Sequence, residues 1–293
     1  LYTQCNFLNP NHLGFNSIVA FRNRYCHFET IWIGNRQINV PVGFTNLAEI
    51  EMKLKKFAYR KTKKECLDLP EKIYVKRNIE FTDEQARIYN DIRTEARATL
   101  RGEELTVTNV ITEILRLHQV ACGFFKTKED EIEPVANKRV DTLLEICEDT
   151  DAKIIIWATY IYNIQQITKE LRARFGVDST VDFYGAVSSE KRTDAIERFQ
   201  NDPKCRFFVA NPATGGLGIT LTAASIVIYY SNSYNAEHRV QSEDRSHRIG
   251  QEKKVTYIDF VAPKTIDEKI LGALKTKFKL SAKTLGEVVR EWF

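Results

Sequence analysis

Two arginines stand three residues apart in the stretch VQSEDRSHRIGQ, residues 240–251. On a helix, positions i and i+3 share one face, so the guanidinium groups of Arg245 and Arg248 would project together. Such a pair can bind phosphate oxygens, because a guanidinium donates two parallel hydrogen bonds. Mixed charges at this spacing are also typical of a solvated helix surface, and the stretch alone leaves both interpretations open.

A glycine-rich stretch, residues 211–222, directly follows a predicted strand. Three glycines fall within four positions: Gly215, Gly216 and Gly218. They let backbone N–H groups approach a phosphate closely, and the hydroxyl groups of Thr214, Thr220 and Thr222 add donors. A tight turn between a strand and a helix explains the same pattern. Since no lysine follows these glycines, the stretch is not a nucleoside-triphosphate P-loop.

A third polar stretch, YGAVSSEKR at residues 184–192, follows another predicted strand. Ser188 or Ser189 can cap the next helix, whose amino end could then hold an anion with Lys191 and Arg192 nearby. Plain helix capping accounts for the same residues.

These stretches need a sheet to position them, and the chain predicts one from residue 137 onward. Short apolar strands alternate there with amphipathic helices, which indicates a parallel sheet covered by helices on both faces. The predicted strands are residues 153–157, 180–184, 207–210, 226–230 and 255–261. Ligands of such sheets lie beyond the carboxyl ends of the strands, so we expect the polar loops at that edge.

Upstream, the sequence predicts a mixture of elements. Residues 72–81 alternate like a strand, residues 82–85 form a capping box that opens a helix, and a second helix passes through His118. Asn46 is expected to cap a helix, and the acidic residues 126–133 are expected to form an exposed loop. We divide the chain into residues 1–81, residues 82–135 with two helices, and residues 136–293 with the sheet.

The composition describes an ordinary globular chain: 293 residues, 43% hydrophobic, 28% charged and a formal charge of +4, which permits an anionic partner. The six cysteines form no C-x-x-C pair and predict no zinc site, which favours reduced thiols and an intracellular location. No apolar run could span a membrane. Because the chain starts at Leu1 and its only methionine is Met52, we expect its true beginning to lie upstream.

The order of these motifs resembles the second RecA-like lobe of superfamily-two helicases, and more narrowly the Swi/Snf family of helicase-like, DNA-dependent ATPases. Motifs IV, IVa, V and VI of that family correspond to residues 153–160, 184–199, 211–222 and 241–251. The ending DR-x-HRIGQ is close to a family signature. The likeness extends upstream to FLNP at residues 7–10 and to RKTKKECLDLPEK at residues 60–72.

The chain also departs from the family pattern. Asn211-Pro-Ala-Thr214 stands where the family has S-T-R-A, so one basic contact is missing at Ala213, and Tyr234-Asn-Ala236 stands where it has W-N-P. These differences favour a bacterial or phage-like branch.

The resemblance implies an α/β fold: a RecA-like sheet between helices, preceded by the tail of a first lobe and a helical inter-lobe region. It further implies that ATP with Mg²⁺ is bound mainly by the first lobe, while Arg245 and Arg248 act as catalytic arginine fingers on the γ-phosphate. The other nucleotide-binding candidates are Gly216, Gly218, Gln241 and Asp244. The candidates for a contact with the DNA backbone, expected to be duplex, are Tyr184, Gly185, Ser188, Lys191, Arg192, Thr214 and Gly215.

The chain contains half of such an active site, because no Gly-Lys dipeptide occurs in its 293 residues. We therefore expect no ATPase activity from the chain alone. Two alternatives stay open: a superfamily-two lobe that acts on RNA, and a non-catalytic DNA-binding or interaction module.

Overall fold

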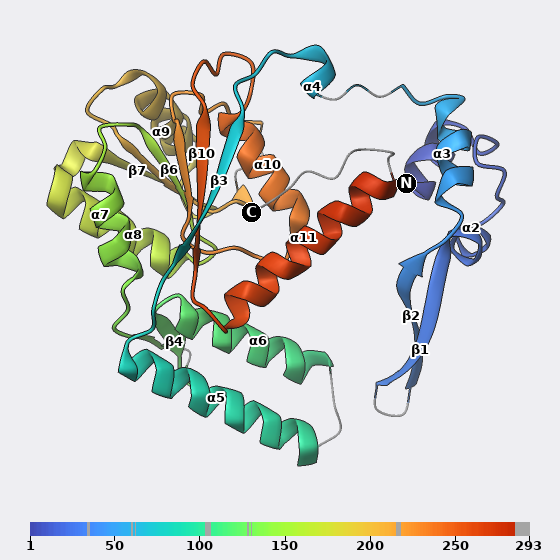
Figure 1. Cartoon of the computed structure of the whole chain (residues 1–293), viewed down its shortest axis with the longest axis horizontal. Coiled ribbons are helices and arrows are strands. Elements are labelled where there is room, and N and C mark those ends of the chain that lie inside the picture. Colours follow the sequence, from blue (N-terminus) through green and yellow to red (C-terminus); the bar gives the residue numbers. More distant parts are fainter. Residues whose placement is uncertain are drawn as a thin grey trace.

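The computed structural model describes residues 1–33, 36–59, 61, 63–102, 107–127, 129, 131–214 and 218–284. Its centre is a six-stranded parallel sheet with the strand order β3-β10-β9-β6-β8-β7 (Figure 1). The strands are β3 (Lys72–Asn78), β6 (Ile154–Trp157), β7 (Thr180–Phe183), β8 (Phe207–Ala210), β9 (Ile226–Tyr229) and β10 (Val255–Val261). All-parallel pairing confirms the predicted fold class.

Helices cover both faces of this sheet, as the apolar strands require. On one face, α7 (Arg139–Glu148) and α8 (Ile161–Phe175) pack against β6 and β8 through buried residues such as Leu143 and Ile167. On the other face, Phe199 of α9 (Ser189–Asn201) packs against Phe208. Figure 1 shows α10 (Ala236–Ser246) and α11 (Ile266–Thr284) on the side opposite α7 and α8. The sheet is thus buried on both faces.

Edge strand β3 comes from outside the segment that was predicted to hold the sheet. It pairs in parallel with β10 from Lys72 opposite Val255 to Asn78 opposite Val261. The chain then leaves the sheet through α5 (Asp83–Gly102) and α6 (Val107–Ala121) before it returns at α7. The strand itself was predicted at residues 72–81, but its partner could not be, because the partner lies about 180 residues away. The boundaries at residues 81 and 135 stay a prediction.

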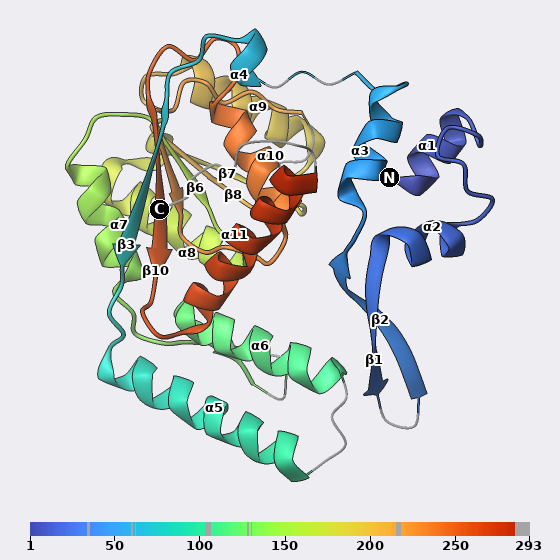
Figure 2. The ribbon, with the colours of Figure 1, turned by 45° about the vertical axis from the view of Figure 1, so that its right-hand side comes forward.

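The residues before β3 form a separate group of elements, which Figure 2 shows beside the sheet. They are α1 (Tyr2–Leu8), α2 (Ile18–Tyr25), the antiparallel strands β1 (Cys26–Ile33) and β2 (Arg36–Phe44), α3 (Leu47–Lys55) and α4 (Lys63–Cys66). Helix α3 contacts α11, and α4 leads into β3. This group includes a hairpin that the sequence did not predict.

Two local predictions are wrong. Asn46 precedes α3, but its backbone is left-handed (φ 53°) and its side chain donates to the Arg24 carbonyl instead of capping the helix. The acidic residues after Lys126 are not only a loop: β4 (Phe124–Lys126) pairs with β5 (Ile132–Pro134). Thr82 caps the helix as predicted, because the Gln85 amide donates to Thr82 Oγ1 at 3.1 Å, but the Gln85 side chain donates to the Val120 carbonyl and does not complete a capping box.

The cysteines are all free, in agreement with the expected reduced state. Among the described residues, no helix is both long and apolar enough to cross a membrane, and no group of side chains could hold a metal ion.

Candidate functional site

The two arginines of residues 240–251 lie at the end of α10, but not on one helical face. The helix ends at Ser246, His247 follows as its C-cap, and Arg248 belongs to the turn beyond. The prediction from i and i+3 spacing is therefore wrong in its geometry. The two guanidinium groups still interact, because the charge of Arg248 lowers the pKa of Arg245.

Arg245 is a buried cation that forms no ion pair among the described residues, and Asp244, a carboxylate whose charge acts on it, pairs with Lys63. Only 8% of the residue is exposed, and Nε has no hydrogen-bond partner in the described part of the chain. Burial is the main cause that lowers its pKa, and the positive charge of Arg248 adds to the effect. Burying an unpaired charge is unfavourable, so this arrangement favours an anionic ligand at the arginine pair.

The second half of the glycine-rich stretch lies against these arginines. Arg248 Nη1 donates to the Gly218 carbonyl and to Thr220 Oγ1, both at 3.3 Å, and the Leu221 amide donates to the Arg245 carbonyl at 2.9 Å. Gly218 has φ +71°, a left-handed conformation that favours glycine. Gly215 and Gly216 lie outside the described residues.

Gln251 holds this arrangement together, a role that the sequence did not suggest. Its side-chain amide lies within 3.1 Å of the carbonyl oxygens of Thr222, Ala224 and Ser246. Gly250, with φ +95°, turns the chain so that Gln251 can reach them. The signature H-R-I-G-Q thus supplies a clamp between the glycine-rich stretch and the end of α10.

The other two nucleotide-binding candidates are engaged with protein side chains. Gln241 Nε2 donates to Glu237 Oε1 at 2.9 Å, one turn earlier on α10. Asp244 Oδ1 forms an ion pair with Lys63 Nζ at 2.7 Å.

The arginine pair lies at the amino end of the sheet. Helix α10 follows β9 and precedes β10, so it runs antiparallel to both strands. Its end approaches Ala224, just before β9, through Gln251, and the Thr256 amide at the start of β10 bonds to the Ser225 carbonyl at 2.9 Å. The expectation that all the polar loops meet at the carboxyl edge is therefore wrong for residues 218–222 and 245–251.

The predicted DNA-binding residues that the structure describes lie at the opposite, carboxyl edge. Tyr184 and Gly185 directly follow β7, and Ser188 caps α9 by accepting from the Lys191 amide at 3.4 Å. Lys191 is exposed, and its ammonium has no partner among the described residues. Arg192 lies with its guanidinium 5.9 Å from the Phe183 ring centre, and its buried Nε has no hydrogen-bond partner in the described chain.

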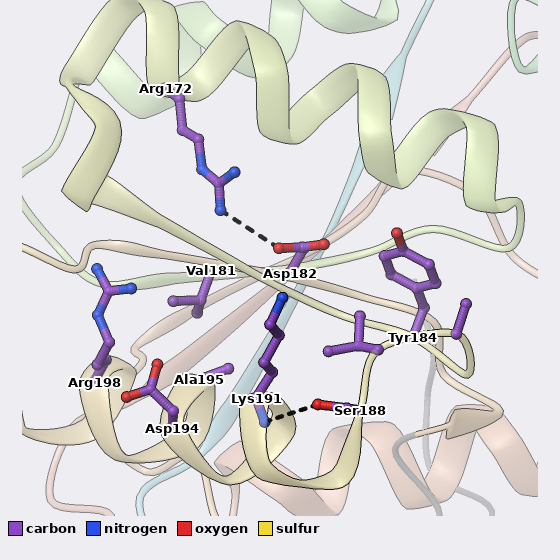
Figure 3. Close-up of a pocket in the computed structure, with 11 residues that line it drawn as sticks. Arg172, Val181, Asp182, Tyr184, Ser188, Lys191, Asp194, Ala195 and Arg198 are labelled. Carbon is purple, nitrogen blue, oxygen red and sulfur yellow. Dashed lines mark hydrogen bonds and ion pairs between the residues drawn. The ribbon is translucent and has the colours of Figure 1, made fainter.

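Tyr184, Ser188 and Lys191 also line a depression of about 620 Å³ along the outer side of edge strand β7, between α8 and α9 (Figure 3). Arg172, from α8, donates to the Thr180 carbonyl at 3.0 Å and lies 3.4 Å from Asp182. It therefore satisfies an outward-facing group of the sheet edge, which makes pairing with another strand less favourable.

Asn211 joins three loops of the carboxyl edge, which sequence reasoning missed. Its Nδ2 donates to the Thr159 carbonyl at 2.8 Å, and its Oδ1 accepts from the Ala213 amide at 2.8 Å. The Thr159 amide donates to Ser231 Oγ at 2.9 Å. The Thr214 amide completes the turn by bonding to the Asn211 carbonyl at 3.1 Å. The loops after β6, β8 and β9 are thus tied together.

A buried ionic network lies between α10 and the strands β3 and β10. Arg239 pairs with Asp259 and donates to Glu243 Oε1 at 3.0 Å. The other oxygen of Glu243, Oε2, accepts from Lys72 Nζ at 2.8 Å and from the Tyr74 hydroxyl at 2.9 Å. Burial alone would raise the pKa of Glu243, but the charges of Lys72 and Arg239 lower it below its ordinary value. These contacts attach α10 to β3 and β10.

Comparison with known proteins agrees with this geometry. Residues 137–250 match the helicase conserved C-terminal domain. An uncharacterized ATP-dependent helicase of Mycoplasma pneumoniae is 30% identical over 238 residues, 80% of this chain and 23% of that protein. The DNA annealing helicase and endonuclease ZRANB3 of Mus musculus is 26% identical over 297 residues, 98% of this chain and 26% of that protein. The chain thus spans about a quarter of the length of these curated relatives.

Two solved structures share the fold. The C-terminal part of the Fun30 ATPase domain is 17% identical, with a TM-score of 0.59, over 74% of this chain and 98% of that chain. The SWI2/SNF2 ATPase core of Sulfolobus solfataricus in complex with dsDNA is 24% identical, with a TM-score of 0.58. The match covers 96% of this chain and 58% of that chain. Residues 137–250 are therefore similar to the helicase conserved C-terminal domain, and the chain shares the fold of the C-terminal part of SWI2/SNF2 ATPases.

Proposed function

We propose that the chain is the second motor lobe of an ATP-dependent DNA translocase. In this reaction water attacks the γ-phosphorus, the bond to the bridging oxygen breaks, and negative charge moves onto the ADP that leaves. Arg245 and Arg248 would neutralise the charge that develops on the transferred phosphoryl group. The observation that carries this proposal is the buried Arg245 guanidinium, which forms no ion pair among the described residues while Arg248 adds a second positive charge.

The groups that hold ATP and Mg²⁺ would come mainly from a first RecA-like lobe. Support comes from residues 1–59, where large apolar side chains are exposed to solvent: Leu1, Phe7, Leu8, Ile18, Val19, Ile38, Val42, Phe44, Met52 and Tyr59. Several exposed apolar side chains within one segment mark a surface that another protein surface covers. Since the 293 residues lack a Gly-Lys dipeptide, we propose that this chain alone does not hydrolyse ATP.

The DNA would lie across the carboxyl edge of the sheet, with its phosphates near Lys191 and Arg192. Such contacts are made to the backbone and are independent of sequence, as movement along DNA requires. A DNA role is favoured over an RNA role because the matched relative ZRANB3 is a DNA helicase and the similar SWI2/SNF2 core was solved with dsDNA.

The proposal is tested by ATP hydrolysis in the full-length protein that contains this chain. We expect duplex DNA to stimulate hydrolysis, RNA to stimulate it much less, and Arg245→Ala to abolish the stimulated rate without loss of DNA binding. Arg174→Ala is the control, because Arg174 is 62% exposed and pairs with Glu148 at the surface, not with any of the candidate site residues. Stimulation by RNA would favour the RNA-acting alternative, and full activity of Arg245→Ala would favour the non-catalytic module.

A further inference from the structure

The segment before β3 is attached to the arginine-bearing turn by three polar contacts. Lys63 Nζ lies 2.7 Å from Asp244 Oδ1 and donates to the His247 carbonyl at 3.0 Å. The His247 ring lies with Nε2 at 2.7 Å from the Pro70 carbonyl. A carbonyl oxygen only accepts, so Nε2 of the imidazole carries the proton. The turn between the two arginines is therefore held by Lys63 and Pro70.

A second attachment to the same segment lies deeper in the fold. Lys72 and Glu243 form an ion pair at 2.8 Å whose side chains are 12% and 2% exposed. By contrast, the side chains of Lys63 and Asp244 are 34% and 37% exposed. The Lys72 contact thus fixes α10 to β3, whereas the Lys63 contact is near enough to solvent to break and re-form as the segment moves.

Arg248 depends on such a contact for its orientation. Its guanidinium is exposed, and its two hydrogen bonds, to Gly218 and Thr220, are both long at 3.3 Å. Lys63 acts on the residue directly before it, through the His247 carbonyl. Because transition-state stabilisation depends on placement within about 1 Å, a small movement of this turn changes the rate strongly.

We propose that Lys63 is a positioning residue, which sets the turn at residues 244–248 according to where the inter-lobe segment lies. The inference rests on the proposed function, since it requires that Arg248 act on a nucleotide. The polar contacts of Lys63 are with Asp244 and the His247 carbonyl, so the role that we assign to it is indirect. It couples the segment that joins the two parts of the chain to the arginine pair, so that the pair is presented only when the segment is seated against α10.

The test uses steady-state hydrolysis by the full-length protein that contains this chain. Lys63→Met keeps the length of the side chain but removes its charge, and we expect it to lower kcat about tenfold, within the range that small misplacements cause. We expect KM for ATP and Kd for DNA to change less than about twofold. Lys63→Arg, which keeps the charge, should recover most of the rate.

Lys254→Ala is the matched control, because it removes another contact to the same segment. Lys254 Nζ lies 3.7 Å from Glu71 Oε2, and both side chains are largely exposed, at 63% and 84%. This contact does not reach the arginine turn, so we expect kcat near that of the unmodified protein. If Lys63 had a merely structural role, kcat would fall only in variants whose Tm also falls.

The coupling to Arg248 is tested by the double variant Lys63→Met with Arg248→Ala. If Lys63 acts through Arg248, the double variant is no slower than Arg248→Ala alone. Losses that multiply, or an unchanged kcat in Lys63→Met, would overturn the inference while the proposed function stands. Normal turnover of Arg248→Ala would instead overturn the proposed function.

Discussion

Arg245 and Arg248 differ in their surroundings, and the difference sets what each can do. Arg245 is buried, and the Leu221 amide donates to its backbone carbonyl, which attaches this part of α10 to the glycine-rich stretch. Arg248 is exposed and lies in a turn beyond the helix. Two neighbouring arginines can bind one anion together, and each guanidinium can donate two parallel hydrogen bonds to its oxygens.

Arg248→Lys should therefore lower activity nearly as much as Arg248→Ala. An ammonium cannot bridge two phosphate oxygens, and arginine fingers in related phosphoryl-transfer enzymes contribute about 10³–10⁵ in rate. We expect kcat in the full-length protein to fall at least about a hundredfold in both variants, with DNA affinity in the absence of nucleotide nearly unchanged. The Arg245→Ala, Arg248→Ala double variant should be little slower than either single variant. Near-normal turnover combined with lost DNA binding would assign Arg248 to the DNA contact.

The sequence named candidate side chains, whose roles stay predictions, but it did not predict how these side chains are held. The resemblance of residues 241–251 to motif VI implied phosphate chemistry for Arg245 and Arg248, but the end of α10 at Ser246 could not be foreseen from an i, i+3 pattern. The roles of Gln251 and Asn211 depend on carbonyl groups of several distant loops. No local pattern encodes such contacts, because the acceptors belong to the backbone and carry no side-chain signal.

At the scale of elements, β3 and α10 depend on one buried ion pair. Lys72→Met should destabilise the fold by about 3 kcal/mol, because removing one partner of a buried pair leaves a charge without full compensation. That corresponds to a fall in Tm of roughly 6–12 °C by calorimetry. Lys254→Ala, which breaks an exposed pair, should change Tm by no more than about 2 °C. If Lys72→Met had the same Tm as the unmodified protein, Arg239 and Tyr74 alone would be enough to stabilise the buried Glu243 carboxylate.

The same network predicts a dependence of stability on pH. The pKa of Glu243 is lowered in the folded chain, so the unfolded chain binds a proton to this group at higher pH. The stabilisation is fully present above the ordinary pKa of 4.5 and is lost as pH falls from there toward the folded value. Denaturant titrations between pH 7 and pH 3 should show this loss in the unmodified protein and less of it in Glu243→Gln, which would already be less stable at pH 7.

Regular elements were predictable wherever the pattern was local. Apolar runs such as residues 207–210 predicted β8 at its observed bounds. The hairpin of β1 and β2 was missed because its strands carry mixed side chains, and only pairing with each other defines them. The place of β3 was missed because a long excursion through α5 and α6 separates it from β10.

At the scale of the whole molecule, the two ends of one sheet hold two different sets of functional candidates. The amino end holds Arg245 and Arg248, and the carboxyl end holds Ser188, Lys191 and Arg192. The central strands β6 and β8 are fully buried, so the middle of the sheet is a tightly packed body that joins the sets. A change at one end can then alter the other only by moving the lobe as a unit.

This separation predicts that changes at the two ends affect different kinetic constants. Lys191→Ala in the full-length protein should raise the DNA concentration for half-maximal stimulation severalfold, equally for all sequences, and lower the log–log salt slope by about 0.9 for the phosphate it releases. Its kcat at saturating DNA should stay within about twofold of normal. Arg248→Ala should show the reverse, a lost kcat with an unchanged DNA requirement. Because the sites share no side chain, the losses of the double variant should multiply. If Lys191→Ala instead lowered kcat at saturating DNA as much as Arg248→Ala does, the carboxyl edge would take part in hydrolysis itself.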